Sequence, residues 1–403
     1  MTERICIMIA AFVCLAASCS REPVSKTVYL KDYLTEEMLR DDAEPAIRKA
    51  LEECMESKGG TLVLPGGTLP VKPDYCYGKY QRISNNDPGD KRIAFDIVGA
   101  DGLTIEGNGT TLLFTGFISP FSIEDSKDVT IRGLNIDYTR TFHSEGLITD
   151  SGKDWVKVRF PDDYKVSLES GIIVFKDEFR NEYPYGNLLE FDSSRKEVAH
   201  YVRDYWVWGP GLQAEALPDG DYKVYDKDIE VTKGNILVFG AAARLNPAFT
   251  LERCDGFTLK DVNIWHCGGM GVIAQRSKDL ELNNVDVVPS PGKDRMISIT
   301  ADATHFVNCK GFIRMTDCTF MNQKDDATNI HGWYSVARRK ISDNQLLLWS
   351  NYGKDFAEPG MEMEFVSHTT MMTYDTLKVE NVYKYNDFLS LVTFAESIPE
   401  AFD

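Results

Sequence analysis

The chain has 403 residues, of which 43% are hydrophobic and 26% are charged, and its formal net charge is −18. A chain of this length can bury a large core and has room for two or three domains, and its balanced composition excludes a disordered protein. The strong negative charge argues against a nucleic-acid partner, because phosphate groups would be repelled. A neutral, hydroxyl-rich ligand would meet no such repulsion.

The first residues are typical of an export signal. Arg4 precedes an apolar run over residues 5–17 that is too short to span a membrane as a helix, and small residues lead to Cys19. This order predicts a bacterial lipoprotein signal over residues 1–19, with Cys19 as the lipidated first residue; a plain secretory signal is the alternative. We therefore expect an exported protein, in the periplasm or on the outer membrane of a Gram-negative bacterium, attached only through a lipid anchor.

An amphipathic helix is predicted in DDAEPAIRKALEECMESKGG, residues 41–60. Its apolar residues fall on one face at helical spacing, and two glycines end it. The segment TLVLPGGTLPV follows as a strand and a turn. A helix at this place can cover the exposed backbone and core at the open end of a sheet, so we predict an N-terminal capping helix.

Five segments share one pattern: a small residue, Gly or Asp two positions later, and then alternating apolar and polar residues. They begin at Ala100, Ser126, Cys254, Ser277 and Cys309. Equivalent residues of neighbouring copies are 26 residues apart at Ile105 and Ile131 and 23 apart at Leu259 and Leu282. Each copy holds one or two short strands, which are too little to bury their own apolar face. Stacked copies predict an all-β fold, a right-handed parallel β-helix, with the small residues stacked at one turn.

The cysteines outside the signal lie at positions 54, 76, 254, 267, 309 and 318. No two of them are spaced as CxxC, which argues against a zinc site. Cys254 and Cys309 occupy the small position of the repeat, so we interpret them as small buried residues. A disulfide is the minor alternative.

Two stretches interrupt the repeats. Between Ile136 and Phe249 the chain shows WVKVRF, SGIIVFKDE and DKDIEVTKGNILVF, and after Gly332 it shows QLLLWS and GMEMEFVSH. Both stretches hold a strand, a long loop and a strand, so we interpret them as inserted antiparallel β-barrel-like domains. The predicted domains are residues 1–19 (signal), 28–139 (capping helix and first coils), 140–247 (barrel-like insert), 248–333 (coils with candidate catalytic acids) and 334–400 (second β-rich insert).

Three carboxylates are candidates for catalysis. Asp325 and Asp326 stand side by side in MNQKDDATNIHG, and Asp302 lies 23 residues before Asp325 in SITADATHF. Since this spacing equals one predicted coil, Asp302 should lie on the order of 5 Å from Asp325 along the axis. Crowded acids serve no structural need, but a glycosidase requires one acid to protonate the leaving oxygen and another to act on water or the anomeric carbon. Solvated turn residues are the competing interpretation.

Other residues near the acids offer further roles. Clustered carboxylates on a β-helix can bind calcium, and a lyase needs a strong base, for which Lys324 and Arg295 are available; Arg295 is also a candidate substrate contact. His305 and His331 flank the acids and can orient substrate or water. Trp333, seven residues past the acidic pair, is a candidate sugar platform.

The segments SPGKDRMISITADATHFVNCKGFI and CTFMNQKDDATNIHG resemble glycoside hydrolase family 110, the exo-acting α-1,3-galactosidases that remove terminal galactose from blood-group-B-type and related glycans. The resemblance extends from GGTLVLPGG through both inserts. It implies a β-helix with inserted barrels, no metal or other cofactor, and hydrolysis with inversion. It also implies that Asp325 is the general acid, and that Asp302 and Asp326 together hold and deprotonate the water.

Members of this family usually continue with further coils after the second insert, so we expect such coils to be missing from a chain of 403 residues. Two other functions stay open: a polygalacturonase-like hydrolase or lyase on acidic polysaccharide, and a non-catalytic glycan-binding β-helix. The negative net charge makes a polyanionic substrate less favourable. The leading prediction is an inverting exo-glycosidase whose partner is a glycan with terminal α-1,3-linked galactose.

Overall fold

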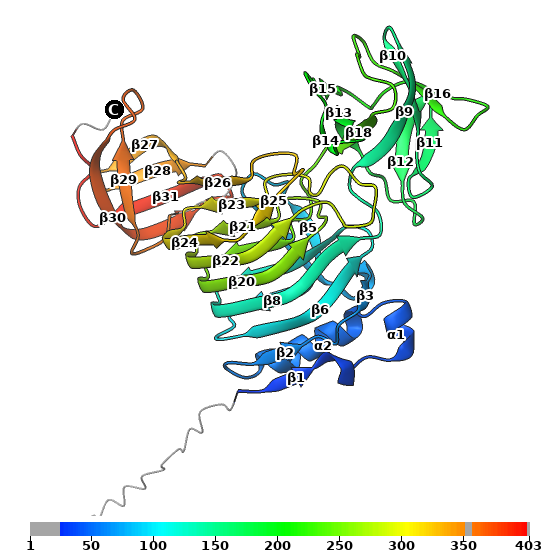
Figure 1. Ribbon diagram of the computed structural model, residues 1–403. Helices are drawn as coiled ribbons and strands as arrows, with labels where there is room; N and C mark the ends of the chain where they lie inside the picture. Colours follow the sequence, from blue (N-terminus) through cyan, green and yellow to red (C-terminus); the bar gives the residue numbers. More distant parts are fainter. Residues whose placement is uncertain (1–24, 351–356, 401–403) are drawn as a thin grey trace, which may run out of the picture.

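The computed structural model describes residues 25–350 and 357–400; the predicted signal with its lipidation site, Cys19, lies outside these residues. The described chain forms a parallel β-helix that carries two antiparallel β-sheet domains (Figure 1). The fold class expected from the repeats, an all-β helix of parallel coils with inserted barrel-like domains and a capping helix, is confirmed. Within the described ranges, no helix combines the length and the apolar character needed to cross a bilayer.

A small helical cap closes the N-terminal end of the β-helix. It comprises β1 (Thr27–Tyr29), η1 (Leu30–Asp32), α1 (Glu36–Arg40) and α2 (Glu44–Met55). The apolar face of α2 is at most 2% exposed at Ala46, Ile47, Ala50, Leu51 and Cys54. This face packs on β1, β2 and β5, so the helix covers the first coil as its apolar spacing predicted.

Two long sheets form the walls of the β-helix, and we call them sheet A and sheet B. Sheet A contains β1, β2 (Thr61–Val63), β3 (Thr68–Val71), β6 (Thr104–Phe114), β8 (Lys127–Tyr138), β20 (Asp255–Ile264), β22 (Lys278–Val287), β24 (Lys310–Thr316) and β25 (Thr319–Phe320). Sheet B contains β4 (Tyr77–Gln81), β5 (Gly89–Val98), β7 (Ile118–Glu124), β19 (Phe249–Glu252), β21 (Val272–Gln275), β23 (Thr304–Val307) and β26 (Thr328–His331). A short helix, η2 (Pro73–Tyr75), precedes β4. The strands pair in parallel, except that β4 is antiparallel to β5.

Equivalent apolar residues of successive coils stack in register inside the β-helix. Ile105 pairs with Ile131, Ile131 with Leu259, and Leu259 with Leu282, and all four side chains are fully buried. The spacings of 26 and 23 residues therefore did measure the coil length at these positions. Because each buried side chain rests on the one below, the core is a continuous column.

The small residues of the repeat stack at the corner between sheets B and A. The register of β8, β20, β22 and β24 aligns Ser126, Cys254, Ser277 and Cys309. The Oγ of Ser277 accepts a hydrogen bond of 3.0 Å from the backbone N–H of Cys254. The six cysteines in the described residues are free thiols; Cys254 is buried and Cys309 is half-buried.

Two antiparallel domains interrupt the coils. Barrel I contains β9 (Ser144–Gly152), β10 (Trp155–Arg159), β13 (Tyr185–Asp192), β14 (Glu197–Val198), β15 (Tyr205–Trp206), β16 (Ala214–Ala216), β17 (Tyr222–Tyr225) and β18 (Ile236–Ala241), with the hairpin of β11 (Lys165–Glu169) and β12 (Ile172–Lys176). Barrel II contains β27 (Val336–Ser342), β28 (Gln345–Trp349), β29 (Glu362–Val366), β30 (Thr373–Lys384) and β31 (Leu389–Phe394). Figure 1 shows the two barrels on opposite sides of the last coils, which hold β23 and β26.

The stacked core predicts a position-specific loss of stability. Replacing Leu259 by Ala removes a buried side chain between Ile131 and Leu282, so it should lower the free energy of unfolding by roughly 2–5 kcal/mol. Replacing the neighbouring exposed residue, Lys260, by Ala should change it by about 0.5 kcal/mol or less. Urea denaturation measures both values, and equal losses would contradict the in-register column.

Candidate active site

The three candidate aspartates lie on two neighbouring coils, just before β23 and β26. These strands pair with an offset of 24 residues, so Asp302 is level with Asp326, and the N–H of Ala303 donates to the Asp326 carbonyl at 2.9 Å. The spacing of 23 residues had predicted that Asp302 is level with Asp325. That prediction is wrong by one residue, because this coil is one residue longer than the coil from β20 to β22. The aspartates nevertheless meet at one edge of sheet B.

Arg244 connects two of these carboxylates. It lies between β18 and β19, where the chain returns from barrel I, and is 81 residues from Asp325 in sequence. One of its Nη atoms donates to Oδ2 of Asp325, and the other lies 3.9 Å from Oδ1 of Asp302. The cation between the two acids offsets the repulsion that the sequence predicted for crowded carboxylates. Nothing in the sequence around Arg244 indicates this role, and sequence reasoning missed it.

A loop from an early coil fixes Arg244 in place. Residues 82–88 join β4 to β5, and the backbone N–H of Arg244 donates to Oδ2 of Asp87 at 2.7 Å. The carbonyl of Arg244 accepts from the N–H of Asp87 at 3.1 Å, and its Nη1 donates to the Asn85 carbonyl at 3.4 Å. These contacts restrict both the backbone and the side chain, so Arg244 is positioned before any ligand arrives.

Asp302 begins a row of hydrogen bonds that runs outward through two histidines. Its Oδ2 lies 2.7 Å from Nδ1 of His305, and Nε2 of His305 lies 2.9 Å from Nε2 of His331. The Nδ1 of His331 lies 2.7 Å from the carbonyl of Gly332. Asp302 and His305 are buried, whereas His331 is half-buried. The row therefore leads from a buried acid to the surface.

The imidazole of His305 lies between the carboxylate of Asp302 and the ring of His331. Which ring nitrogens donate and which accept in this row depends on the tautomers of the two histidines. The contact with His305 gives the buried carboxylate of Asp302 a hydrogen-bonding partner, and this reduces the cost of burying it.

Lys324 precedes the acidic pair and faces barrel I. Its Nζ donates to Oδ1 of Asn187 at 2.7 Å, and burial lowers the pKa of Lys324 to about 8. The ammonium of Lys324 lies against Gly240 of β18, and a Cβ added at position 240 would lie 1.9 Å from Nζ. Lys324 therefore connects the loop that carries the acids to barrel I, and a side chain at position 240 would clash with it.

The segment that carries Asp302 is also attached to barrel I. Glu145 of β9 accepts hydrogen bonds from the N–H groups of Met296 and Ile297, at 2.8 and 3.1 Å. Burial raises the pKa of Glu145 to about 7. Barrel I thus holds both acid-bearing segments of the β-helix, one through Glu145 and the other through Lys324.

The remaining predicted site residues lie in different surroundings. His305 and His331 lie beside the acids, as described above. Trp333 is half-buried, and its Nε1 donates to Oγ of Ser350 at 3.3 Å. Arg295 is 8% exposed, and its guanidinium contacts Oδ1 of Asp137 at 2.5 Å and the carbonyl of Tyr138 at 2.8 Å. These contacts give Arg295 a structural task, because it pairs the buried charge of Asp137.

The site gathers exposed and buried carboxylates around one cation. Asp325 and Asp326 are exposed, Asp302 is buried and contacts His305, and Arg244 lies between the two coils. Such a patch provides a proton donor and proton acceptors for one bound molecule. In the part of the chain that the structure describes, no three His, Cys, Asp or Glu side chains are grouped to hold a metal ion.

The parallel β-helix, the flanking barrels and the clustered carboxylates are the features of a β-helix enzyme, with the aspartates as candidate acid–base groups. Two family models match the chain: GLAA-B beta-barrel domain I at residues 144–237 and GLAA-B beta-barrel domain II at residues 350–403. An alpha-1,3-galactosidase A of Shewanella woodyi is 30% identical, over 99% of this chain and 67% of that protein.

Two more distant relatives match over nearly the same part of this chain. An alpha-1,3-galactosidase B of Bacteroides thetaiotaomicron is 23% identical over 99% of this chain and 66% of its own length. An alpha-1,3-galactosidase A of Bacteroides fragilis is 24% identical over 100% of this chain and 68% of its own length. The chain belongs to the α-1,3-galactosidase family, glycoside hydrolase family 110. It spans about two thirds of the length of these curated relatives.

Glu145 predicts a pH-dependent contribution to stability. Its pKa is about 7 in the folded chain and about 4.5 when exposed, so the folded state binds this proton more tightly between those values. The contribution is complete below pH 4.5 and is lost as the pH rises through 7. The free energy of unfolding of the wild type, relative to Glu145→Gln, should therefore fall by up to roughly 3 kcal/mol between pH 4.5 and pH 8.

Urea denaturation of both proteins at several pH values measures this difference. Glu230 is exposed, so Glu230→Gln serves as the control and should give a difference from the wild type that does not change with pH in this way. A constant difference between the wild type and Glu145→Gln would contradict the assignment.

Proposed function

We propose that this protein is an inverting exo-glycosidase that hydrolyses terminal α-1,3-linked galactose from glycans. Family membership over nearly the whole chain supports the substrate and the reaction, since the relatives are alpha-1,3-galactosidases. The observation that carries the proposal is the meeting of Asp302 with Asp325 and Asp326 at one edge of sheet B, with Arg244 between the first two. That edge lies between the two barrels (Figure 1).

In the proposed reaction, water replaces the leaving sugar in one displacement. Asp325 donates a proton to the glycosidic oxygen while the bond from that oxygen to the anomeric carbon breaks. Asp302 and Asp326 orient the water and accept its proton as its oxygen bonds to the anomeric carbon from the opposite face. The level position of Asp302 and Asp326 on neighbouring coils supports their sharing one water molecule.

Arg244 supports an inverting rather than a retaining geometry. Inverting enzymes hold their carboxyl groups roughly 6.5–9.5 Å apart to leave room for water, whereas retaining enzymes hold them closer. A guanidinium that reaches both Asp302 and Asp325 keeps these carboxyl groups out of mutual contact. It also keeps Asp325 oriented until the substrate enters.

The histidine row supports the role of Asp302 as a base. His305 holds Oδ2 of Asp302 and leaves Oδ1 to face Arg244 and a water molecule. In this proposal His305 positions Asp302, while the half-buried His331 and Trp333 remain candidates for direct contact with the sugar. Arg295 is left out of the substrate contacts, since it binds Asp137.

We also propose export as a lipoprotein, with Cys19 as the lipidated residue. Arg4, the apolar run and the small residues before Cys19 support it. An enzyme held on the outside of a cell by a lipid would meet glycans that do not enter the cell.

Asp325→Asn tests the proposed acid. The amide keeps the shape but cannot donate the proton, so galactose release from an α-1,3-galactobiose should fall by about 100- to 10,000-fold while the fold is kept. Proton NMR of the wild-type reaction should show β-galactose as the first product, as inversion requires. Asp317→Asn, an exposed acid after β24, is the control and should retain full turnover. Normal turnover of Asp325→Asn would remove the proposal, and an unsaturated uronate product from galacturonan would favour a lyase.

Arg244→Met tests the positioning of the acids. Without the guanidinium, Asp302 and Asp325 lose their common partner, so kcat/KM should fall by roughly 100-fold. Arg132→Met also removes an arginine that pairs with a carboxylate, Glu106, but on the exposed face of sheet A, so it should have no effect on kcat/KM. If both variants keep wild-type kinetics, Arg244 does not position the acids.

A further inference from the structure

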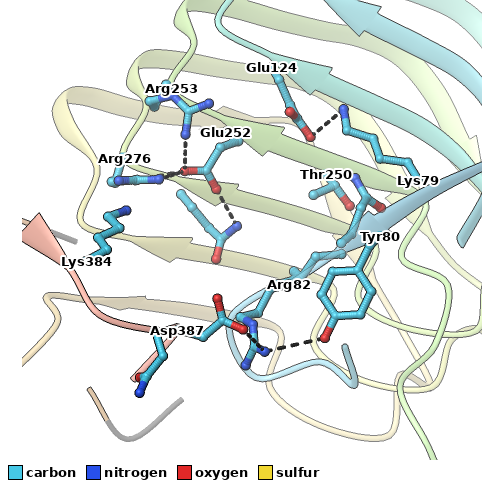
Figure 2. A pocket seen from close by; sticks show the side chains of 14 residues that line it. Lys79, Tyr80, Arg82, Glu124, Thr250, Glu252, Arg253, Arg276, Lys384 and Asp387 are labelled. Atoms are coloured by element: carbon cyan, nitrogen blue, oxygen red, sulfur yellow. Dashed lines mark hydrogen bonds and ion pairs between the residues drawn. The ribbon is translucent and has the colours of Figure 1, made fainter. Parts of the chain in front are cut away.

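A separate pocket lies where barrel II meets sheet B, and Figure 2 shows it from close by. Its floor includes Thr250 of β19, one wall includes Tyr80 and Gln81 of β4, and the opposite wall includes Lys384 at the end of β30. The cavity volume is about 300 Å³. Small-molecule sites range from roughly 300 to 1,000 Å³, so this pocket is large enough for one small ligand.

The pocket is distinct from the candidate active site but close to it. Thr250 pairs with Ile273, and Ile273 pairs with His305, so Thr250 lies two strand spacings, roughly 10 Å, from His305. The loop of residues 82–88 lies between the two sites: it holds Arg244 at one end, and Ile83 lines the pocket at the other. Its Ser84 N–H donates to Oε1 of Gln275 at 2.8 Å, which fixes it on sheet B.

Two buried polar atoms of the pocket lining have no hydrogen-bond partner among the residues that the structure describes. They are Oε1 of Gln81 and Oγ1 of Thr250, on residues that are 5% and 2% exposed. Leaving such an atom unpaired costs roughly 1–3 kcal/mol. The amide of Gln81 is oriented by its Nε2, which donates to Oγ of Ser122 at 2.9 Å, so Oε1 stays available as an acceptor. A ligand hydroxyl can donate to Gln81 and exchange a hydrogen bond with Thr250.

The charged residues around the pocket are largely paired with one another. Lys79 contacts Glu124 at 2.9 Å, and Arg82 contacts Asp387 at 2.6 Å across the junction with barrel II (Figure 2). The carboxylate of Glu252 forms ion pairs with Arg276 and, at 3.2 Å, with Arg253. Since these charges are compensated, the lining apart from Lys384 offers hydrogen bonds rather than a net charge. A neutral polar ligand suits this part of the pocket better than an ion.

Two exposed residues complete the lining from opposite walls. Tyr80 is 56% exposed and presents an aromatic ring of the kind on which a sugar ring can pack. In the described chain, the ammonium of Lys384 makes no side-chain hydrogen bond or ion pair, so it adds a positively charged donor at the rim. The pocket thus combines polar oxygens that can bond to the hydroxyls of a ligand, an aromatic ring and a donor at the rim. These are the features of a carbohydrate site.

We propose that this pocket binds one pyranose ring of a glycan, apart from the ring that the aspartates cleave. A glycan held at both places is kept near the acids by the second contact, which raises the effective concentration of its chain ends. The site uses the side chains of sheet B and barrel II, and it does not need hydrolysis to operate.

Binding stoichiometry tests the proposal. Isothermal titration calorimetry with galactose and with lactose is performed on the Asp325→Asn variant, in which hydrolysis does not interfere. If one sugar binds at the acids and one in the pocket, the stoichiometry is two sugars per chain. Introducing Tyr80→Ala and Lys384→Ala into the Asp325→Asn variant should lower it to one. Tyr75→Ala, which replaces a tyrosine of equal exposure (57%) outside the pocket, is the matched control and should leave the stoichiometry unchanged.

Two further measurements locate the sugar. Thr250→Val keeps the volume and removes one hydroxyl, so it should weaken the pocket affinity about tenfold, as expected for one lost hydrogen bond. Crystals soaked in either sugar should show a ring whose hydroxyls reach Gln81 and Thr250. If the proposed hydrolysis fails but the pocket is correct, the rim substitutions change the stoichiometry from one to zero. Unchanged stoichiometry in the rim variant, or an empty pocket in both soaked crystals, overturns the proposal.

Discussion

The parallel backbone ladder between successive coils determines where the candidate aspartates and histidines of this protein lie. Strands β8 and β20 pair in register although 128 residues separate their partners, because the stacked apolar residues inside the helix continue across the insertion of barrel I. The same ladder makes Asp302 level with Asp326 and places His305 next to the coil that carries His331. The aspartates are thus brought together by strand register, and barrel I holds the segments that carry them.

Sequence periodicity was sufficient to predict the coils, the capping helix and the meeting of the aspartates, because these features repeat locally along the chain. It was insufficient where contacts join distant segments. Arg244 is 81 residues from Asp325, and neither residue carries a pattern that refers to the other. The one-residue error at Asp302 has a similar cause: loops between strands vary in length, so a coil measured in one place does not fix the register in another. Arg295 seemed available from sequence because its partner, Asp137, lies on a different coil.

Each buried acid near the candidate site has a partner that offsets the cost of burying it. Asp137 is paired with Arg295, Asp302 contacts the imidazole of His305, and Glu145 accepts from two backbone N–H groups. Asp325 and Asp326, in contrast, are exposed. The protein therefore keeps Asp325 and Asp326 in contact with solvent, while Asp302 is buried and held by His305.

The chain leaves the β-helix after β8 to form barrel I and returns at β19. Strand β19 then pairs with β7 in sheet B and β20 pairs with β8 in sheet A, so the insertion interrupts neither sheet. The strands of barrel I contact the acid-bearing segments at defined positions, which include Glu145, the Asn187 contact to Lys324 and an apolar cluster with Met296 and Ile297. Loops of barrel I away from those points are free to lengthen, shorten or change composition during evolution while the chemistry below stays intact. The architecture thereby separates the part of the molecule that can diversify from the part that must not.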